Sequence, residues 1–159
     1  MKATKLVLLA VQLIVLVLFM GIHLMTATPG SSSGNGNPAL LLLMIVVPLF
    51  IIMVLLWQRI FRYYKLTKQV VIIGLLFTSL HIIAGIMYQR MELANYRGVI
   101  EKALIKQYGY ADQQYLMDIT SGLTIHVNNQ YFNLNTFFML VSFSIFIALL
   151  WLVVLEEKN

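Results

Sequence analysis

The stretch QVVIIGLLFTSLHIIAGIMY (Gln69–Tyr88) contains no Asp, Glu, Lys or Arg. An α-helix needs about 20 predominantly apolar residues to cross the hydrocarbon core of a bilayer, and this stretch has that length. Three similar stretches lie elsewhere in the chain, at Leu6–Met25, Ala39–Trp57 and Thr136–Leu155. The sequence therefore predicts four membrane-spanning helices.

The composition excludes an ordinary water-soluble domain. Hydrophobic residues make up 60% of the 159 residues, and charged residues make up only 11%. A soluble protein of this size has too much surface for its volume to bury so much apolar area. We therefore predict an all-α membrane protein, a single integral membrane domain (1–159) built as a four-helix transmembrane bundle in a lipid bilayer. The first span is longer than the apolar region of a signal peptide, so we expect an uncleaved anchor.

Basic residues predict the orientation of the spans, because Lys and Arg accumulate in the cytoplasmic loops of membrane proteins. The loop between spans one and two has no basic residue. The basic residues near the termini and around the short segment between spans two and three are Lys2, Lys5, Arg59, Arg62, Lys65, Lys68 and Lys158. Both termini are therefore expected in the cytoplasm. The absence of cysteine from an exported segment favours a bacterial plasma membrane. Because much of the +5 net charge lies beside the spans, no nucleic-acid partner is expected.

Residues 89–135 form the one sizeable polar region, predicted as an extracytoplasmic insert between spans three and four. In its first half, apolar side chains recur at helical spacing (Leu93, Tyr96, Ile100, Leu104 and Tyr108), which predicts an amphipathic helix ending at Gly109. In its second half, LTIHVNNQYFNLN (Leu123–Asn135), apolar and polar residues alternate on both sides of Asn128-Asn129. This alternation predicts a short β-hairpin with a two-residue turn.

Small and polar residues form one stripe of the third span. Gly74, Thr78, His81 and Gly85 are spaced four, three and four residues apart, which places them on one helix face. In lipid, such a stripe is typical of a helix–helix contact, because glycine allows close approach and Thr or His can hydrogen-bond across. The candidate partners of His81 on other spans are Gln12, Ser142 and Ser144.

A second interpretation gives His81 a cofactor, since ionisable groups within a membrane are functional candidates. His23 in the first span is the other histidine expected in the membrane. Helical rise places His23 about 25 Å and His81 about 18 Å from the inner ends of their spans, a mismatch that helix tilt would absorb. On this alternative, His23 and His81 are the axial ligands of haem in a small electron-transfer subunit.

The sequence lacks the patterns of known catalytic sites. No span contains an acid–base pair, and no nucleophile elbow, HExxH or phosphate-binding glycine loop is present. No metal site is predicted, because no two histidines share a metal-binding spacing and there is no cysteine. The acids of the insert (Glu92, Glu101, Asp112 and Asp118) are expected on a solvated face. The leading interpretation is a non-enzymatic protein without a cofactor, acting by contact with a membrane-protein partner or with a second copy of itself as an accessory or regulatory subunit.

Overall fold

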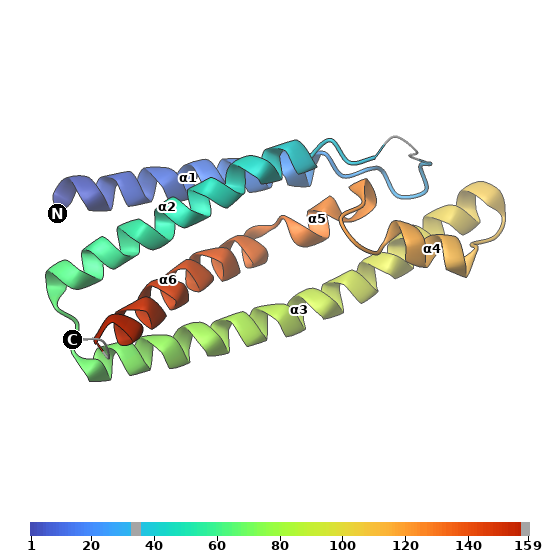
Figure 1. Cartoon of the computed structure of the whole chain (residues 1–159). Helices are drawn as coiled ribbons and strands as arrows, with labels where there is room; N and C mark the ends of the chain where they lie inside the picture. Colours follow the sequence, from blue (N-terminus) through green and yellow to red (C-terminus); the bar gives the residue numbers. More distant parts are fainter. Residues whose placement is uncertain (33–35, 157–159) are drawn as a thin grey trace.

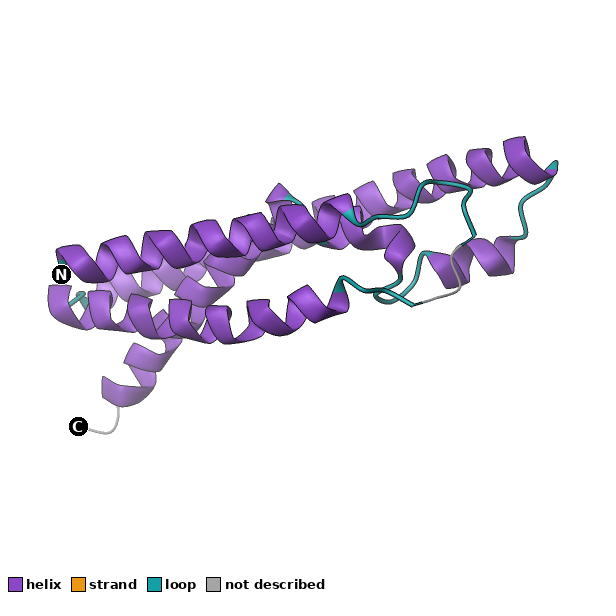
Figure 2. Ribbon diagram, turned by 90° about the horizontal axis from the view of Figure 1, so that it is seen from above, coloured by secondary structure: helices purple, strands orange, loops and turns teal. Residues whose placement is uncertain are grey.

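The computed structural model describes residues 1–32 and 36–156, and these form only helices and loops (Figure 2). The four long helices are α1 (Lys2–Leu24), α2 (Leu40–Tyr64), α3 (Lys68–Tyr108) and α6 (Leu134–Glu156). Each contains a segment long and apolar enough to cross a membrane. The prediction of four apolar helices of membrane-spanning length is therefore confirmed.

The start of α1, the α2–α3 turn and the end of α6 lie at one end of the molecule (Figure 1). We call this the basic end, because all but one of the flanking basic residues named above lie there; Lys158 is outside the described residues. α6 packs against both α2 and α3, and α1 packs mainly on α2. The helices thus follow the order α1–α2–α6–α3 in space, and a closed four-helix bundle stays a prediction.

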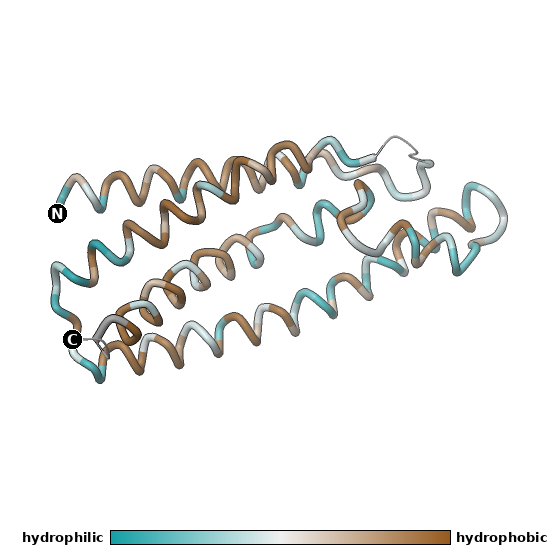
Figure 3. The backbone as a smooth tube through the Cα atoms, viewed as in Figure 1, coloured by the Kyte–Doolittle hydropathy of each residue, from teal (hydrophilic) through white to brown (hydrophobic). Residues whose placement is uncertain are grey.

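Hydrophobic residues predominate along the middle lengths of the four long helices (Figure 3). Many of their large hydrophobic side chains are exposed, as a lipid-facing surface requires. Val17, Leu41 and Phe77 are each about 70% exposed. A core of buried apolar side chains, including Val15, Phe19 and Met53, joins α1, α2 and α6. The polar surface gathers at the two ends of the helices, so the molecule is consistent with contact with a lipid bilayer.

α3 continues well beyond the predicted third span, because no proline follows Tyr88 and the glycine at position 98 is accommodated within the helix. The residues predicted as an additional amphipathic helix therefore belong to α3 itself, which ends where Gly109 adopts a left-handed φ of 82°. The chain then turns back into α4 (Gln113–Ile119), whose first N–H groups are capped by Asp112. Ile100 and Leu104 of α3 pack against Leu116 of α4 in a small core separate from that of the membrane helices.

The predicted β-hairpin is wrong. Residues Ile125–Val127 form the 3₁₀ helix η1, and Asn128–Tyr131 form the short helix α5. The favoured two-residue hairpin turns require positive φ at the first central residue, whereas Asn128 is right-handed helical with φ −55°. The side chain of Asn128 is 1% exposed and pairs with Asn37, each amide donating to the other's oxygen at 2.7 and 3.2 Å. This amide pair between distant residues stabilises the helical conformation of α5 more than the local alternation of apolar and polar residues favours a strand.

Two further contacts tie the loop between α1 and α2 to the segment around α5. The backbone N–H of Ala27 donates to the carbonyl of Ile125 at 3.1 Å, and Asn37 donates to the carbonyl of Leu123 at 2.9 Å. Gly30 is buried against Ala103 of α3, where a β-carbon on Gly30 would lie 3.3 Å from that of Ala103. We call residues 89–132 together with the described part of this loop the distal cap, because they cover the end opposite the basic end (Figure 1).

Acidification is expected to loosen the distal cap through His126. This side chain is 2% exposed, and burial lowers the pKa of its imidazole below the ordinary value. Below about pH 6.5 His126 takes up a proton in the unfolded chain, whereas in the folded cap it stays neutral down to its lowered pKa. The free energy of unfolding of the cap therefore falls as the pH decreases from about 6.5 towards the lowered pKa. Above about pH 6.5 this contribution is constant. Protection of the cap amides from hydrogen exchange, relative to the intrinsic exchange rate at each pH, should fall from pH 7 to pH 5, and His126→Gln should remove most of this loss. Equal pH dependence in both proteins would contradict the assignment.

Candidate functional site

The glycine-containing stripe of α3 faces α6 along its whole length. A β-carbon on Gly74 would lie 2.7 Å from Cδ1 of Leu149, and one on Gly85 would lie 2.6 Å from Cγ of Met139. Thr78 lies between them, 4% exposed, and its hydroxyl donates to the carbonyl of Gly74 in its own helix. The two helices therefore approach closely at Gly74 and Gly85, because these residues have no side chain. The predicted helix–helix contact is thus found within the chain, between α3 and α6.

His81 makes its hydrogen bond across this interface. Its Nδ1 lies 2.9 Å from Oγ of Ser142 on α6. Of the three candidate partners, Ser142 is therefore confirmed, whereas the Ser144 hydroxyl donates to the carbonyl of Val141. Ser144 and Ala148 are both completely buried, so small residues of α6 also line its helix contacts.

We expect His81→Leu to lower the stability of the folded chain only slightly. Hydrogen bonds between membrane helices contribute about 0.6 kcal/mol on average and rarely more than about 1.7 kcal/mol. Ser142→Ala should cost a similar amount, and the double variant should cost less than the sum, as measured by unfolding in mixed micelles. Strict additivity would show that the two side chains are not coupled. Loss of function in a normally accumulating His81→Leu protein would give the imidazole a role beyond packing.

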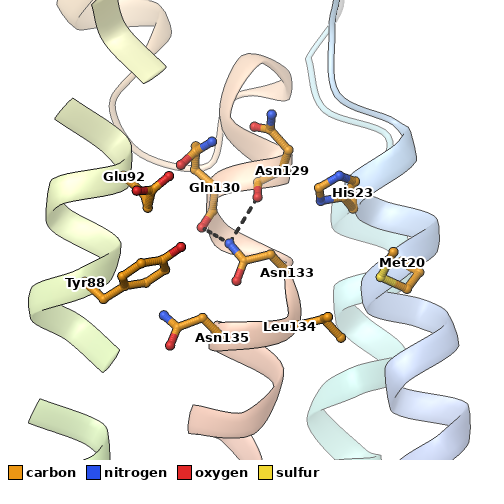
Figure 4. Close-up of a pocket in the computed structure, with 9 residues that line it drawn as sticks. All are labelled: Met20, His23, Tyr88, Glu92, Asn129, Gln130, Asn133, Leu134 and Asn135. Carbon is orange, nitrogen blue, oxygen red and sulfur yellow. Dashed lines mark hydrogen bonds between the residues drawn. The ribbon is translucent and has the colours of Figure 1, made fainter. Parts of the chain in front are cut away.

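A cavity of about 370 Å³, with several polar side chains in its walls, lies where the apolar lengths of α1, α3 and α6 end (Figure 4). Three elements supply its walls: α3, α1, and the α5–α6 corner. Its lining residues are Met20, His23, Tyr88, Glu92, Asn129, Gln130, Asn133, Leu134 and Asn135. Glu92 and Tyr88 on α3 face His23 on α1 across the asparagines of the corner (Figure 4).

The α5–α6 corner fixes the orientation of His23. α5 ends at Tyr131 and α6 begins at Leu134, so the intervening residues leave the regular hydrogen-bond pattern. The carbonyl oxygen of Phe132 lies 3.1 Å from Nδ1 of His23. Because a carbonyl oxygen can only accept, Nδ1 carries the hydrogen in this contact, and Nε2 of the neutral ring is then an acceptor. The ring of Phe132 packs edge-on against Phe19 with centroids 5.3 Å apart, which holds the corner on α1.

Asparagine side chains hold the corner together and attach it to α3. Asn133 and Thr136 cap the start of α6 reciprocally, since each backbone N–H donates to the other's side-chain oxygen. The amide nitrogens of Asn133 and Asn135 both donate to Oε1 of Gln89 at 3.2 Å. Asn135 also donates to the carbonyl of Gly85 at 3.1 Å. These contacts fix the amide orientations and use the hydrogen-bond donors of both asparagines.

The same region contains buried polar atoms that have no hydrogen-bond partner among the described residues. They are Nε2 of Gln89 and Oδ1 of Asn129. Desolvation raises the pKa of the nearby Tyr96 phenol, and its hydrogen bond with Asn129 opposes part of that rise. Leaving such a group unpaired costs about 1–3 kcal/mol. A ligand or a water molecule that hydrogen-bonds to these atoms would therefore stabilise the site.

The structure places the two histidines proposed as haem ligands in different surroundings. His23 lines the cavity and bonds to the α5–α6 corner, whereas His81 is not among the lining residues and bonds to Ser142. Coordination of haem by both stays a prediction, which a Soret band in the purified protein would test. No group of three or more His, Cys, Asp or Glu side chains suited to a metal ion occurs in the described part of the chain.

Glu92 is the residue of the cavity that sequence reasoning missed. We expected it on a solvated face with the other acids, but it is half-buried and lines the cavity. Two features of the sequence could have indicated the cavity. Asparagine and glutamine side chains are dense in NNQYFNLN (residues 128–135), immediately before the apolar run of the fourth span. Tyr88 and Glu92 lie four residues apart at the end of the apolar run of the third span. Both signals mark the same membrane boundary.

No known protein family matches this chain, and no curated protein or solved structure matches it. The cavity, the α3–α6 contact and the distal cap are therefore interpreted from their own geometry and chemistry.

Proposed function

We propose that the chain is a non-enzymatic, multi-pass membrane protein that acts by protein–protein contact, as an accessory or regulatory subunit. Its partner is another membrane protein or a second copy of the chain. The proposal rests on one observation, the apolar surface of the distal cap. Large apolar and aromatic side chains are 38–71% exposed there: Met91, Val99, Ile105, Tyr108, Tyr110, Tyr115, Met117 and Leu123.

This surface lies beyond the apolar lengths of the helices. The part of α3 that follows Tyr88 contributes about 30 Å of helix at 1.5 Å per residue. On α3, the side chains of this surface from Val99 onwards lie about 16 Å or more beyond Tyr88. Lipid tails do not cover them there, so their exposure costs free energy unless another protein covers them. Tyrosine and methionine are also enriched where proteins meet. Together these features support contact through the distal cap.

The proposed orientation has both termini in the cytoplasm and the distal cap outside, in a bacterial plasma membrane. The support is the distribution of charge: the basic residues that flank the spans gather at the basic end. In the distal cap the basic residues Arg90, Arg97, Lys102 and Lys106 are balanced by the acids of the same segment. The cap then meets partners outside the cytoplasm.

Site-specific photocrosslinking in intact cells tests the contact. A photoreactive residue at Tyr110 or Leu123, both exposed in the distal cap, should give one discrete adduct whose mass identifies a partner or a second copy. The same residue at Phe77, as exposed as Tyr110 but on the apolar length of α3, serves as the control for unspecific capture. Absence of any discrete adduct from both cap positions would contradict the proposal.

A further inference from the structure

We infer that the cavity between α1, α3 and the α5–α6 corner binds the ammonium group of an amphiphile, with Glu92 as the counter-charge. This binding goes beyond the contact proposed for the distal cap and involves different residues. Its chemical class is an ammonium group joined to an apolar chain, which is present both in an ethanolamine phospholipid and in a free long-chain amine.

Charge selects a cation for this cavity. Of the lining residues that the structure describes, Glu92 carries the one full charge, and none is Lys or Arg. No ion pair to Glu92 is present among the described residues. A half-buried carboxylate without a charged partner is stabilised by a cationic ligand, and a charge-assisted hydrogen bond of this kind is roughly twice as strong as a neutral one. An anionic group would meet repulsion at the same place.

The neighbouring groups also favour a hydrogen-bond donor. Nε2 of His23 is an acceptor, because Nδ1 is committed to the carbonyl of Phe132. The donor nitrogens of Asn133 and Asn135 are already used inside the protein. An ammonium group brings three donors and no acceptor, so it can donate to the carboxylate of Glu92 or to Nε2 of His23.

The arrangement of polar and apolar walls fits an amphiphile that enters from the membrane. Glu92 and Gln130 lie on the side of the distal cap, and Met20 and Leu134 lie on the side of the apolar helices (Figure 4). Met20 and Leu134 are 39% and 56% exposed, so they present an apolar surface where lipid tails begin. The Tyr88 hydroxyl lies between the two levels, where it can donate to a phosphate. A chain against Met20 and Leu134 would place its headgroup at Glu92.

Lipid retention by the full chain tests this inference. The protein is reconstituted in nanodiscs of equimolar phosphatidylethanolamine and phosphatidylglycerol, and the lipids that remain bound after transfer to detergent are measured by mass spectrometry. The wild-type protein should retain phosphatidylethanolamine preferentially. Glu92→Gln should lower that preference about tenfold, the factor expected for loss of a charge-assisted hydrogen bond. Glu92→Lys should reverse the preference towards phosphatidylglycerol.

Glu101→Gln is the matched control, because Glu101 lies on the same helix but accepts a hydrogen bond from Gln113 in the α3–α4 hairpin. It should keep the wild-type preference. Extraction of the protein from native membranes then distinguishes the two sources: phosphatidylethanolamine or a long-chain amine should co-purify with it and be lost in Glu92→Gln. Equal retention of both lipids by the wild-type protein, or an unchanged preference in Glu92→Gln, would overturn the inference.

Discussion

Gly85→Leu should separate α3 from α6 and cause the largest loss of membrane-domain stability among single substitutions in the stripe. A β-carbon at this position would already lie 2.6 Å from Cγ and Sδ of Met139, and a leucine adds further carbons on the same side. Overpacking of this kind costs about 1–3 kcal/mol and occasionally more. Separation would also break the hydrogen bond from Asn135 to the carbonyl of Gly85. The combined loss should exceed that of His81→Leu.

Gly98→Leu provides a matched control in the same helix. A β-carbon at Gly98 has no neighbouring atom within 4 Å, so the leucine meets open space. Both substitutions gain the same helix propensity, about 1 kcal/mol relative to glycine, and only Gly85→Leu adds a clash. Equilibrium unfolding in mixed micelles should therefore show a clear loss for Gly85→Leu and no loss for Gly98→Leu. Equal stability of the two variants would mean that α3 and α6 do not pack as described.

Ile100→Ala should unfold the α3–α4 part of the distal cap while the membrane helices remain folded. Ile100 is 0% exposed and lies in the small core with Leu104 and Leu116. Removing its side chain should cost about 2–5 kcal/mol, a large share of what so small a core can supply. Because this core is separate from that of α1, α2 and α6, the loss should remain local.

Limited proteolysis and hydrogen exchange of the purified protein measure this effect. Ile100→Ala should make the segment around α4 cleavable and speed its amide exchange, while exchange in the apolar lengths stays slow. Ile105→Ala removes the same atoms from the same helix at a position that is 48% exposed, and it should behave like wild type. If the two variants exchanged alike, the cap would not depend on a core centred at Ile100.

Periodicity and length were sufficient to predict the parts of the fold that lipid determines. A run of about 20 apolar residues favours a helix in a bilayer, because a helix pairs the backbone polar groups of the segment within the segment itself. The stripe from Gly74 to Gly85 also followed from spacing alone, whereas Ser142 was one of three candidate partners of His81 until the structure distinguished among them. These features depend on residues close in sequence, or on one repeated helical face.

The distal end could not be predicted in the same way, because its structure depends on pairs far apart in the chain. Asn37 and Asn128 are separated by 91 residues, and their side chains hold α5 in a helical conformation that the local alternation disfavours. His23 and the carbonyl of Phe132 are separated by 109 residues. The cavity exists only because these contacts bring α1, α3 and the α5–α6 corner together, so Glu92 looked like any other exposed acid.

The sidedness of the distal cap is tested most directly by single cysteines, which are unambiguous in a chain that contains none. Ser121→Cys places a thiol at an exposed position of the cap, and Lys65→Cys places one in the exposed α2–α3 turn at the basic end. A membrane-impermeant maleimide should label Ser121→Cys on intact cells and should label Lys65→Cys only after the membrane is permeabilised. Labelling of both from the same side, or of Lys65→Cys alone on intact cells, would contradict the proposed orientation.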